Sequence, residues 1–264
     1  MLTTVTSSVV RQHEVAQGMH LLELSAPAIA REGRPGQFVM VDCPGEASFL
    51  RRPLALQSIR PREGVISVLY SVVGTGTGEL SHLKGGEEVS ILGPLGHAVA
   101  PPASARHIVA IAGGIGIASL TALMDEAVAA GKRVTLLHGG RNNALMYPAH
   151  LLPKGVKELT ATDDGSAGHR GFVTHLLPHV EADADWIVAC GPTPMFRTLA
   201  HMLKEGAVSK PITALLELRM GCGFGACYGC TVVTPQGGRL VCKDGPAFSI
   251  ADIDWDGPIA PKVH

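Results

Sequence analysis

The chain lacks an excess of charge of either sign. Its 22 Lys and Arg residues balance 23 Asp and Glu residues, which gives a formal net charge of −1 at pH 7. Binding to nucleic acid or to anionic lipid depends on concentrated positive charge, and a balanced chain provides no such attraction. The composition therefore predicts neither nucleic acid nor a membrane surface as a partner.

The chain also lacks a recognisable secretory leader and a long uninterrupted hydrophobic segment. Residues 1–6 show no basic region followed by an apolar core. The stretch from His107 to Met124 contains no Asp, Glu, Lys or Arg, but the glycines of Gly113-Gly114-Ile115-Gly116 lie within it. Glycines at this point favour a buried strand, a loop and a helix over a membrane span. We therefore expect a cytoplasmic protein that does not cross a membrane.

Internal repeats, low-complexity tracts and the H-E-x-x-H metal motif are absent as well. What remains is an ordinary globular composition, with 46% hydrophobic and 17% charged residues. A chain of 264 residues is long enough for two domains and a small third one.

The most informative feature that is present is a group of four cysteines near the C-terminus. Cys222, Cys227, Cys230 and Cys242 follow the spacing C-x4-C-x2-C-x11-C, and the first three match the plant-type pattern that ligates a [2Fe–2S] cluster. A loop around a cluster must approach it closely and adopt positive φ angles, and glycines permit both. The loop supplies them at Gly221, Gly223, Gly225 and Gly229. The sequence therefore predicts an iron–sulfur protein that transfers electrons.

Two other interpretations of these cysteines stay open. A structural zinc site normally shows two C-x(2–4)-C pairs, whereas here three thiols lie close together in sequence and the fourth stands apart. A disulfide framework is typical of short secreted domains rather than of a long apolar chain. Cys43 and Cys190 lie in other contexts and are not needed as ligands.

The order of short segments predicts an α+β multidomain fold in three parts. Residues 1–101 carry β-rich runs between turn residues, which is typical of a small antiparallel barrel. Residues 102–211 alternate between strand and helix patterns, which favours a parallel sheet with helices on its faces. Its strands are expected at 108–112, 134–138, 156–161 and 186–189, and its helices at 117–130, 173–179 and 195–204. Residues 212–264 form a small cysteine module, with strands expected around 231–234 and 239–241.

Two glycine turns follow predicted strands of the central part. In Gly113-Gly114-Ile115-Gly116 a diphosphate could approach the backbone at a helix N-terminus. The other turn is Cys190-Gly191-Pro192. Open α/β sheets bind ligands beyond the carboxyl ends of their strands, so the two turns together predict a nucleotide site. Each turn alone is also explained as a tight connection between a strand and a helix. Cys190 alone is also explained as a small residue packed in the core.

The barrel part offers two weaker motifs. In Arg51-Arg52-Pro53-Leu54-Ala55 an arginine entering a strand can hold a phosphate, although adjacent arginines are also common at a solvated edge. In residues 68–77, Gly76 and Thr77 open a short predicted helix whose backbone N–H groups can bind a phosphate.

Taken in order, these motifs resemble the ferredoxin–NADP⁺ reductase superfamily. Within it, the stretch from Glu217 to Cys230, followed by Cys242 to Phe248, is similar to the electron-transfer subunit of NAD-linked (class 1B) dihydroorotate dehydrogenase. Residues 162–166 and 171–173 match the same family. The resemblance spans nearly the whole chain.

The resemblance implies FAD on the barrel, a [2Fe–2S] cluster on the cysteines, and NAD(H), with NADH favoured, on the central part. The implied FAD residues are Arg52, Pro53, Leu54, Ala55, Leu69, Tyr70, Ser71, Gly76 and Thr77. The expected nicotinamide-nucleotide residues are Gly113, Gly114, Gly116, Cys190, Gly191 and Pro192. Similar proteins usually carry serine at the position of Ala55, so this chain departs from the pattern by losing a hydroxyl beside the flavin ring.

The resemblance also implies a partner. This is an FMN-containing catalytic subunit that oxidises dihydroorotate to orotate in pyrimidine biosynthesis, in a heterotetramer with two copies of each subunit. Electrons then pass through the cluster and FAD to NAD⁺, and no residue of this chain is expected to act on dihydroorotate. Three alternatives remain. The first is a related reductase subunit that serves sulfite reductase or a ferredoxin-dependent transhydrogenase. The second is a self-contained oxygenase reductase, against which the 11-residue gap between Cys230 and Cys242 argues, and the third is a zinc-stabilised binding module without a redox role.

Overall fold

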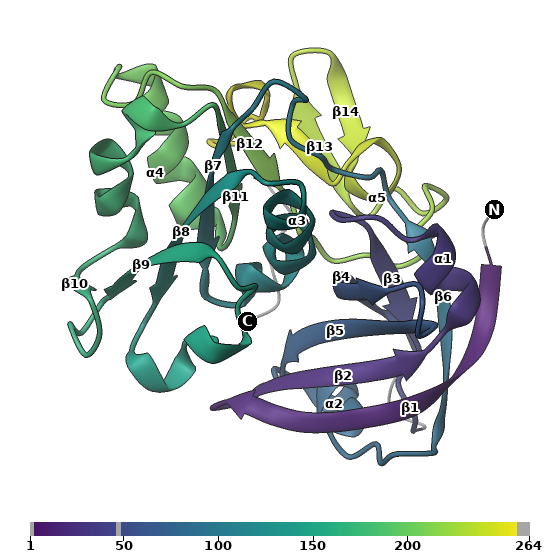
Figure 1. Cartoon of the computed structure of the whole chain (residues 1–264). Coiled ribbons are helices and arrows are strands. Elements are labelled where there is room, and N and C mark those ends of the chain that lie inside the picture. Colours follow the sequence, from purple (N-terminus) through teal and green to yellow (C-terminus); the bar gives the residue numbers. More distant parts are fainter. Residues whose placement is uncertain (1–2, 46–48, 258–264) are drawn as a thin grey trace.

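Six antiparallel strands in the N-terminal part close into a barrel, drawn at the lower right in Figure 1. The computed structural model describes residues 3–45 and 49–257. Around the barrel the strand order is β1-β2-β5-β4-β3-β6, and β6 pairs with β1 to complete the closure. The strands are β1 (Thr3–Ala16), β2 (Met19–Ser25), β3 (Phe38–Val41), β4 (Arg52–Arg60), β5 (Val65–Ser71) and β6 (Glu88–Leu95), with short helices α1 (Pro27–Glu32) and α2 (Thr75–Leu80).

The barrel forms because β-branched and aliphatic residues line its interior. Leu22, Val39, Leu56, Ile66 and Ile91 come from five different strands, and each has no exposed surface. Closure leaves no unpaired strand edge, which removes the usual site of unwanted strand association.

The central part is a seven-stranded sheet in the order β10-β9-β8-β7-β11-β12-β15. All its pairings are parallel except that of β15 with β12. The strands are β7 (His107–Gly113), β8 (Arg133–Gly140), β9 (Val156–Thr162), β10 (His169–Arg170), β11 (Trp186–Cys190), β12 (Ile212–Leu215) and β15 (Ala247–Ser249). The chain leaves β7 towards β8 on one side and later returns to place β11 on the other. The strand order therefore reverses between β7 and β11, and this is where open α/β sheets bind ligands.

Helices α3 (Ile117–Ala129) and α4 (Thr193–Lys204) follow the two strands at this point. From Ile117 to Met124 every residue of α3 is buried, because the helix lies between the sheet and the barrel. The segment Val173–His179, predicted as a helix, is a 3-10 helix. Its Pro178 has no N–H to donate, so the segment cannot complete a regular set of α-helical hydrogen bonds.

The C-terminal part combines a hairpin with two strands of the central sheet. The hairpin strands β13 (Thr231–Thr234) and β14 (Gly237–Leu240) pair antiparallel, and α5 (Val241–Asp244) follows. β12 and β15 both lie within 212–264, so the central sheet continues beyond the predicted boundary at residue 211. Residues 258–264 of that predicted module lie outside the described residues. The predicted fold class, a barrel, a parallel-sheet part and a small cysteine-bearing part, is confirmed.

Two apolar clusters fix the three parts against one another. One contains Phe38 and Met40 of the barrel together with Ile111 of the sheet and Cys230 of the cysteine loop. The other joins Leu69 of the barrel to α3. Shared cores of this kind hold the barrel, the sheet and the cysteine loop in one arrangement, so that a site built between them keeps its geometry.

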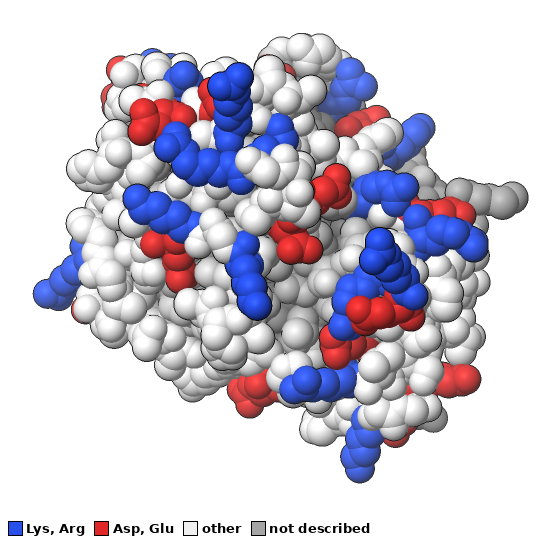
Figure 2. All heavy atoms as spheres, in the orientation of Figure 1, with Lys and Arg blue, Asp and Glu red and all other residues white. Residues whose placement is uncertain are grey.

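No helix within the described residues is long and apolar enough to span a bilayer. Figure 2 shows basic and acidic side chains interspersed over the displayed face of the described residues, without a continuous basic surface there.

Candidate functional site

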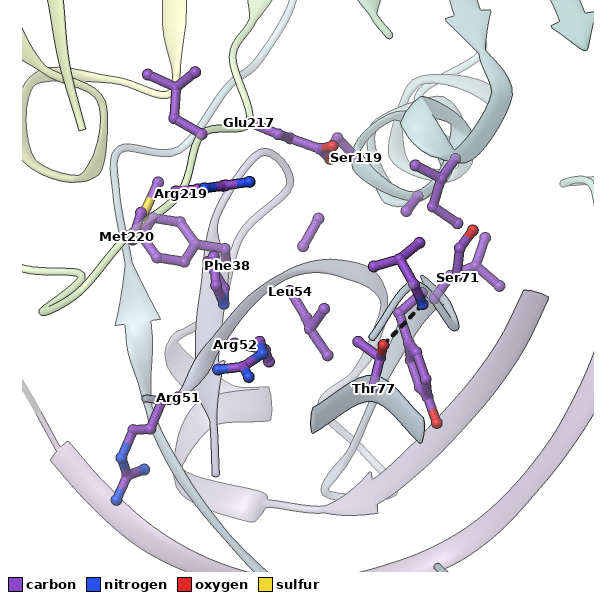
Figure 3. A pocket seen from close by; sticks show the side chains of 18 of the residues that line it. Phe38, Arg51, Arg52, Leu54, Ser71, Thr77, Ser119, Glu217, Arg219 and Met220 are labelled. Atoms are coloured by element: carbon purple, nitrogen blue, oxygen red, sulfur yellow. Dashed lines mark hydrogen bonds between the residues drawn. The ribbon is translucent and has the colours of Figure 1, made fainter. Parts of the chain in front are cut away.

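A pocket of about 580 Å³ opens between the barrel, the start of α3 and the segment Leu215–Met220 (Figure 3). All nine residues predicted to hold FAD line it: Arg52, Pro53, Leu54, Ala55, Leu69, Tyr70, Ser71, Gly76 and Thr77. They come from the beginning of β4, the end of β5 and the first turn of α2, which adjacent barrel strands bring together. The sequence motifs, separated by up to 25 residues, thus converge on one cavity.

The loop before α2 is held open by Thr77. Its Oγ1 accepts hydrogen bonds from the backbone N–H groups of Val73 at 3.0 Å and Gly74 at 3.3 Å, and its hydroxyl donates to the Gly74 carbonyl at 3.1 Å. A side chain added at Gly74 would meet no atom within 4 Å. The loop therefore has a fixed shape with free space beside Gly74, but its own N–H groups are engaged, so the donors left for a diphosphate are those of the first turn of α2.

The two arginines of the barrel motif have different surroundings. Arg51 donates through Nη2 to the Ser90 hydroxyl at 2.9 Å, which ties β6 to the start of β4. Arg52 donates to the backbone carbonyl of Leu50, and its side chain lies beside the pocket in Figure 3. The Arg52 guanidinium carries a permanent positive charge beside the cavity, where it would attract an anionic diphosphate, whereas the Arg51 guanidinium is directed away from the cavity.

Tyr70 forms a buried part of the pocket wall. It is 2% exposed, and its ring stacks on that of His20 with the centroids 5.8 Å apart and the planes at 19°. Burial raises the pKa of its phenol above the ordinary value, so the group stays neutral over the physiological range. A neutral aromatic wall suits the flat, largely apolar ring of a flavin.

Several lining residues were missed by the sequence motifs. They come from β3, from the start of α3 and from the segment before the cysteines: Phe38, Ile115, Ala118, Ser119, Leu215, Leu216, Glu217, Leu218, Arg219 and Met220. The available signals were the nearness of Glu217–Met220 to Cys222 in the sequence and the family resemblance of the stretch that begins at Glu217. Ser119 donates to Glu217 Oε1 at 2.6 Å, so α3 is joined to that segment in the wall of the pocket.

The cysteine loop follows directly after Met220, and its thiols are arranged in two pairs. The backbone N–H of Cys227 donates to Cys222 Sγ at 3.4 Å, and that of Cys242 donates to Cys230 Sγ at 3.4 Å. Interactions between the side chains join the same partners, Cys222 with Cys227 and Cys230 with Cys242. Among the described residues, no three or more such ligands surround a single ion position. Two pairs fit a [2Fe–2S] cluster, in which each iron takes two cysteine ligands.

The backbone of this loop also favours bound thiolates. Burial alone would raise the pKa of the Cys222 thiol, but hydrogen bonds from the backbone N–H groups of Phe224, Cys227 and Ala226 and from the Cys227 side chain lower it to about 6. The Ala226 N–H lies 3.2 Å from Cys222 Sγ. Since the thiolate is the metal-binding form, these donors prepare the site for iron. Burial, together with the neighbouring Cys230 thiol, raises the pKa of Cys242.

One side of the loop packs on the barrel and the other faces solvent. A Cβ added at Gly223 would lie 2.6 Å from Met40 Cγ, so only glycine fits against β3. Cys227 is exposed, as are Phe224 and Tyr228, whose side chains are 48% and 69% accessible. The loop therefore connects the wall of the pocket to the molecular surface.

The two predicted nucleotide turns lie side by side at the carboxyl ends of β7 and β11. Ile115 of the first turn lines the pocket, but the residues predicted to bind the nucleotide do not: Gly113, Gly114, Gly116, Cys190, Gly191 and Pro192. A Cβ at Gly116 would lie 2.2 Å from the Cys190 carbonyl oxygen, and one at Gly191 would lie 3.1 Å from Gly113 Cα. Close packing between the turns thus accounts for these glycines whether or not a nucleotide binds. Cys190 is fully buried, which agrees with a packed small residue.

Replacing Gly116 with alanine is expected to lower the stability of the protein by about 1–3 kcal/mol, because the added methyl group has to push the two turns apart. Denaturant unfolding measures the change. Gly78→Ala is the matched control, since a Cβ at Gly78 in α2 meets no atom within 4 Å. Equal stability of Gly116→Ala and the parent protein would contradict the close contact.

Known proteins with related sequences decide the family. The electron transfer subunit of dihydroorotate dehydrogenase B (NAD(+)) from Desulforamulus reducens is 35% identical over 262 residues, covering 95% of this chain and 98% of the relative. The corresponding subunit from Bacillus cereus strain Q1 is 35% identical over 253 residues, covering 93% and 96% of the two chains. This chain belongs to the family of electron-transfer subunits of dihydroorotate dehydrogenase B.

A family model described as the iron–sulfur cluster binding domain of dihydroorotate dehydrogenase B matches residues 217–254 of this electron-transfer subunit. The match begins at Glu217 and includes all four cysteines. It confirms the iron–sulfur interpretation over the zinc and disulfide alternatives.

Solved structures agree with the fold. An NADH-dependent reduced ferredoxin-NADP oxidoreductase has 30% identity and a TM-score of 0.85, with 96% of this chain and 91% of that chain covered. The ferredoxin reductase of a carbazole 1,9a-dioxygenase has 20% identity and a TM-score of 0.66, with 79% and 67% covered. The second likeness shows the shared reductase fold alone.

Proposed function

We propose that this chain carries electrons from an FMN-bearing dihydroorotate dehydrogenase subunit through a [2Fe–2S] cluster and FAD to NAD⁺. The observation that carries the proposal is the segment Leu215–Met220, which lines the pocket on one side and leads directly into the cysteine loop on the other. A single short segment thus lies between the flavin and cluster positions. Electron transfer in proteins needs such closely held centres.

The cofactors are FAD, a [2Fe–2S] cluster and NAD(H), and bound FAD exchanges two electrons with a nicotinamide and single electrons with a cluster. Arg52 and the first turn of α2 bind the diphosphate of FAD. Leu54, Leu69 and Tyr70 provide the apolar wall that keeps water from the ring. Cys222 with Cys227, and Cys230 with Cys242, hold the two irons. We place the nicotinamide nucleotide at the turns after β7 and β11, because the strand order reverses there.

The exposed side of the cysteine loop is the surface that we assign to the catalytic partner. Phe224 and Tyr228 are large, apolar and exposed, and they flank the exposed Cys227. Apolar and aromatic side chains of this kind form the centre of protein interfaces. A partner that covers them would also bring its own flavin near the cluster and away from water.

Co-purification tests this function. When co-expressed with a dihydroorotate dehydrogenase B catalytic subunit, the tagged chain is expected to retain it and to reduce NAD⁺ on addition of dihydroorotate. Tyr228→Asp, which places a charge on the apolar surface, is expected to weaken the complex about 10-fold or more. The matched control is Val10→Asp, a similarly exposed apolar residue on β1.

The same preparation measures the stoichiometry, for which we propose two copies of each subunit, and fractionation of cells tests the proposed cytoplasmic location. A chain that binds FAD and iron but retains no such partner would contradict the assignment. The 30% identity to an NADH-dependent reduced ferredoxin-NADP oxidoreductase supports one rival, a reductase subunit that serves a ferredoxin-linked partner. NADH-dependent reduction of ferredoxin without dihydroorotate activity would favour that rival.

A further inference from the structure

The two ends of the pocket differ in charge. Arg51 and Arg52 lie at one end, while Ser119, Glu217 and Arg219 lie across the cavity from them in Figure 3. At the second end the charge of Arg219 is offset by Glu217, the one acidic residue among the described lining residues. The first, positive end therefore suits the diphosphate of FAD.

The other end of the pocket lies next to Ile115, which belongs to the Gly113–Gly116 turn at the edge of the sheet. We place the nicotinamide at that turn, and the flavin ring has to lie against the nicotinamide to exchange electrons with it. The second end of the pocket therefore suits the flavin ring.

Two polar side chains of the pocket wall are engaged by the protein itself. The Thr77 hydroxyl fixes its own loop, and Arg51 bonds Ser90 on β6. Ala55 of the barrel lines the pocket and packs against the apolar cluster that contains α3, and its methyl group offers no hydrogen bond. Helix α3 packs directly against β4, the strand that carries Ala55. Ser119 supplies the hydroxyl that α3 presents to the same cavity.

Ser119 is held in a defined orientation. Its side chain is 6% exposed, and its hydroxyl donates to Glu217 Oε1 at 2.6 Å. A short bond to a carboxylate is stronger than one between neutral groups. Because the hydroxyl hydrogen is directed to Glu217, the lone pairs of the serine oxygen remain as acceptors for a further group.

We propose that Ser119, held by Glu217, accepts a hydrogen bond from the ring of the bound FAD and thereby favours the reduced flavin. The ring nitrogen N5 is an acceptor in oxidised flavin and carries a hydrogen in reduced flavin, so an oriented acceptor matches the reduced form alone. Ser119 then tunes the flavin from α3, the helix that packs against the strand carrying Ala55. The inference rests on the FAD site of the proposed function.

The test is an equilibrium measurement on the purified holoprotein, without partner or dihydroorotate. The flavin is reduced slowly beside a reference dye of known potential, and its absorbance gives the equilibrium constant for two-electron reduction. Ser119→Ala is expected to lower this constant about three- to tenfold, the effect of losing one hydrogen bond. Ser119→Cys keeps the side-chain volume but replaces the hydroxyl with a weak acceptor, and it is expected to shift the constant in the same direction.

Thr121→Val is the matched control. Thr121 lies on the same helix and is buried, and its hydroxyl donates to the Ile117 carbonyl at 2.9 Å, outside the pocket lining. This variant is expected to keep the constant of the parent protein. A constant within twofold of the parent in both Ser119 variants, or an equal shift in Thr121→Val, overturns the inference while leaving FAD binding intact. A parent protein that binds no flavin overturns the FAD site and the inference together.

Discussion

Serine in place of Cys230 is expected to abolish dihydroorotate-dependent NAD⁺ reduction by the complex, with a loss of at least about 100-fold. Cys230 is 2% exposed, and its sulfur accepts the Cys242 N–H at 3.4 Å, so the site offers no room for another ligand to replace it. Losing even an outer-shell partner of a metal site costs about 10- to 100-fold, and a direct ligand matters more. Iron analysis and the visible absorbance of the cluster follow the loss directly.

The same variant is expected to keep its FAD and to oxidise NADH with an artificial acceptor such as ferricyanide, because the flavin pocket does not include Cys230. Cys43→Ala is the matched control: Cys43 is buried in the barrel core and lies outside the cysteine loop. Its iron content should equal that of the parent. Full iron content in Cys230→Ser would show that this thiol is not a ligand.

Local patterns were sufficient to predict the three-part fold. β-rich runs between turn residues marked the barrel strands, and the uncharged run from His107 to Met124 marked β7 and the start of α3, because both signals arise from burial within one segment. The assignment of β12 and β15 to the central sheet was not predictable in this way. Their pairing brings together Leu215 and Ala247, which are distant in sequence, and no local period records such a contact.

The residues of the candidate site likewise fall into those that a local motif predicts and those that it does not. The glycines, the arginine and the cysteine spacing were visible because each motif needs a particular residue type at a particular backbone position. Ser119 and Glu217 gave no such signal, since a serine in a helix and a glutamate before a loop are ordinary residues. Their possible role becomes visible only in the structure, where the Ser119 hydroxyl donates to Glu217 Oε1 at 2.6 Å in the wall of the pocket.

Alanine in place of Arg52 is expected to weaken FAD binding about 10- to 100-fold, the usual effect of losing a hydrogen bond to a charged group. Arg52 begins β4 at the positive end of the pocket. Its guanidinium is the closest match in this wall to a diphosphate, because its planar fork can donate two parallel bonds to phosphate oxygens. Titration of the apoprotein with FAD, followed by the quenching of flavin fluorescence, measures the dissociation constant.

Arg62→Ala is the matched control, because Arg62 is an exposed arginine in the turn between β4 and β5, outside the pocket lining. Its affinity for FAD should equal that of the parent protein. The loss in Arg52→Ala should shrink when salt is raised, since ions screen an attraction between partly exposed charges. Equal affinities of Arg52→Ala and Arg62→Ala would place the diphosphate elsewhere. The cavity would then have to hold the cofactor through the backbone N–H groups in the first turn of α2, which would replace the positive charge.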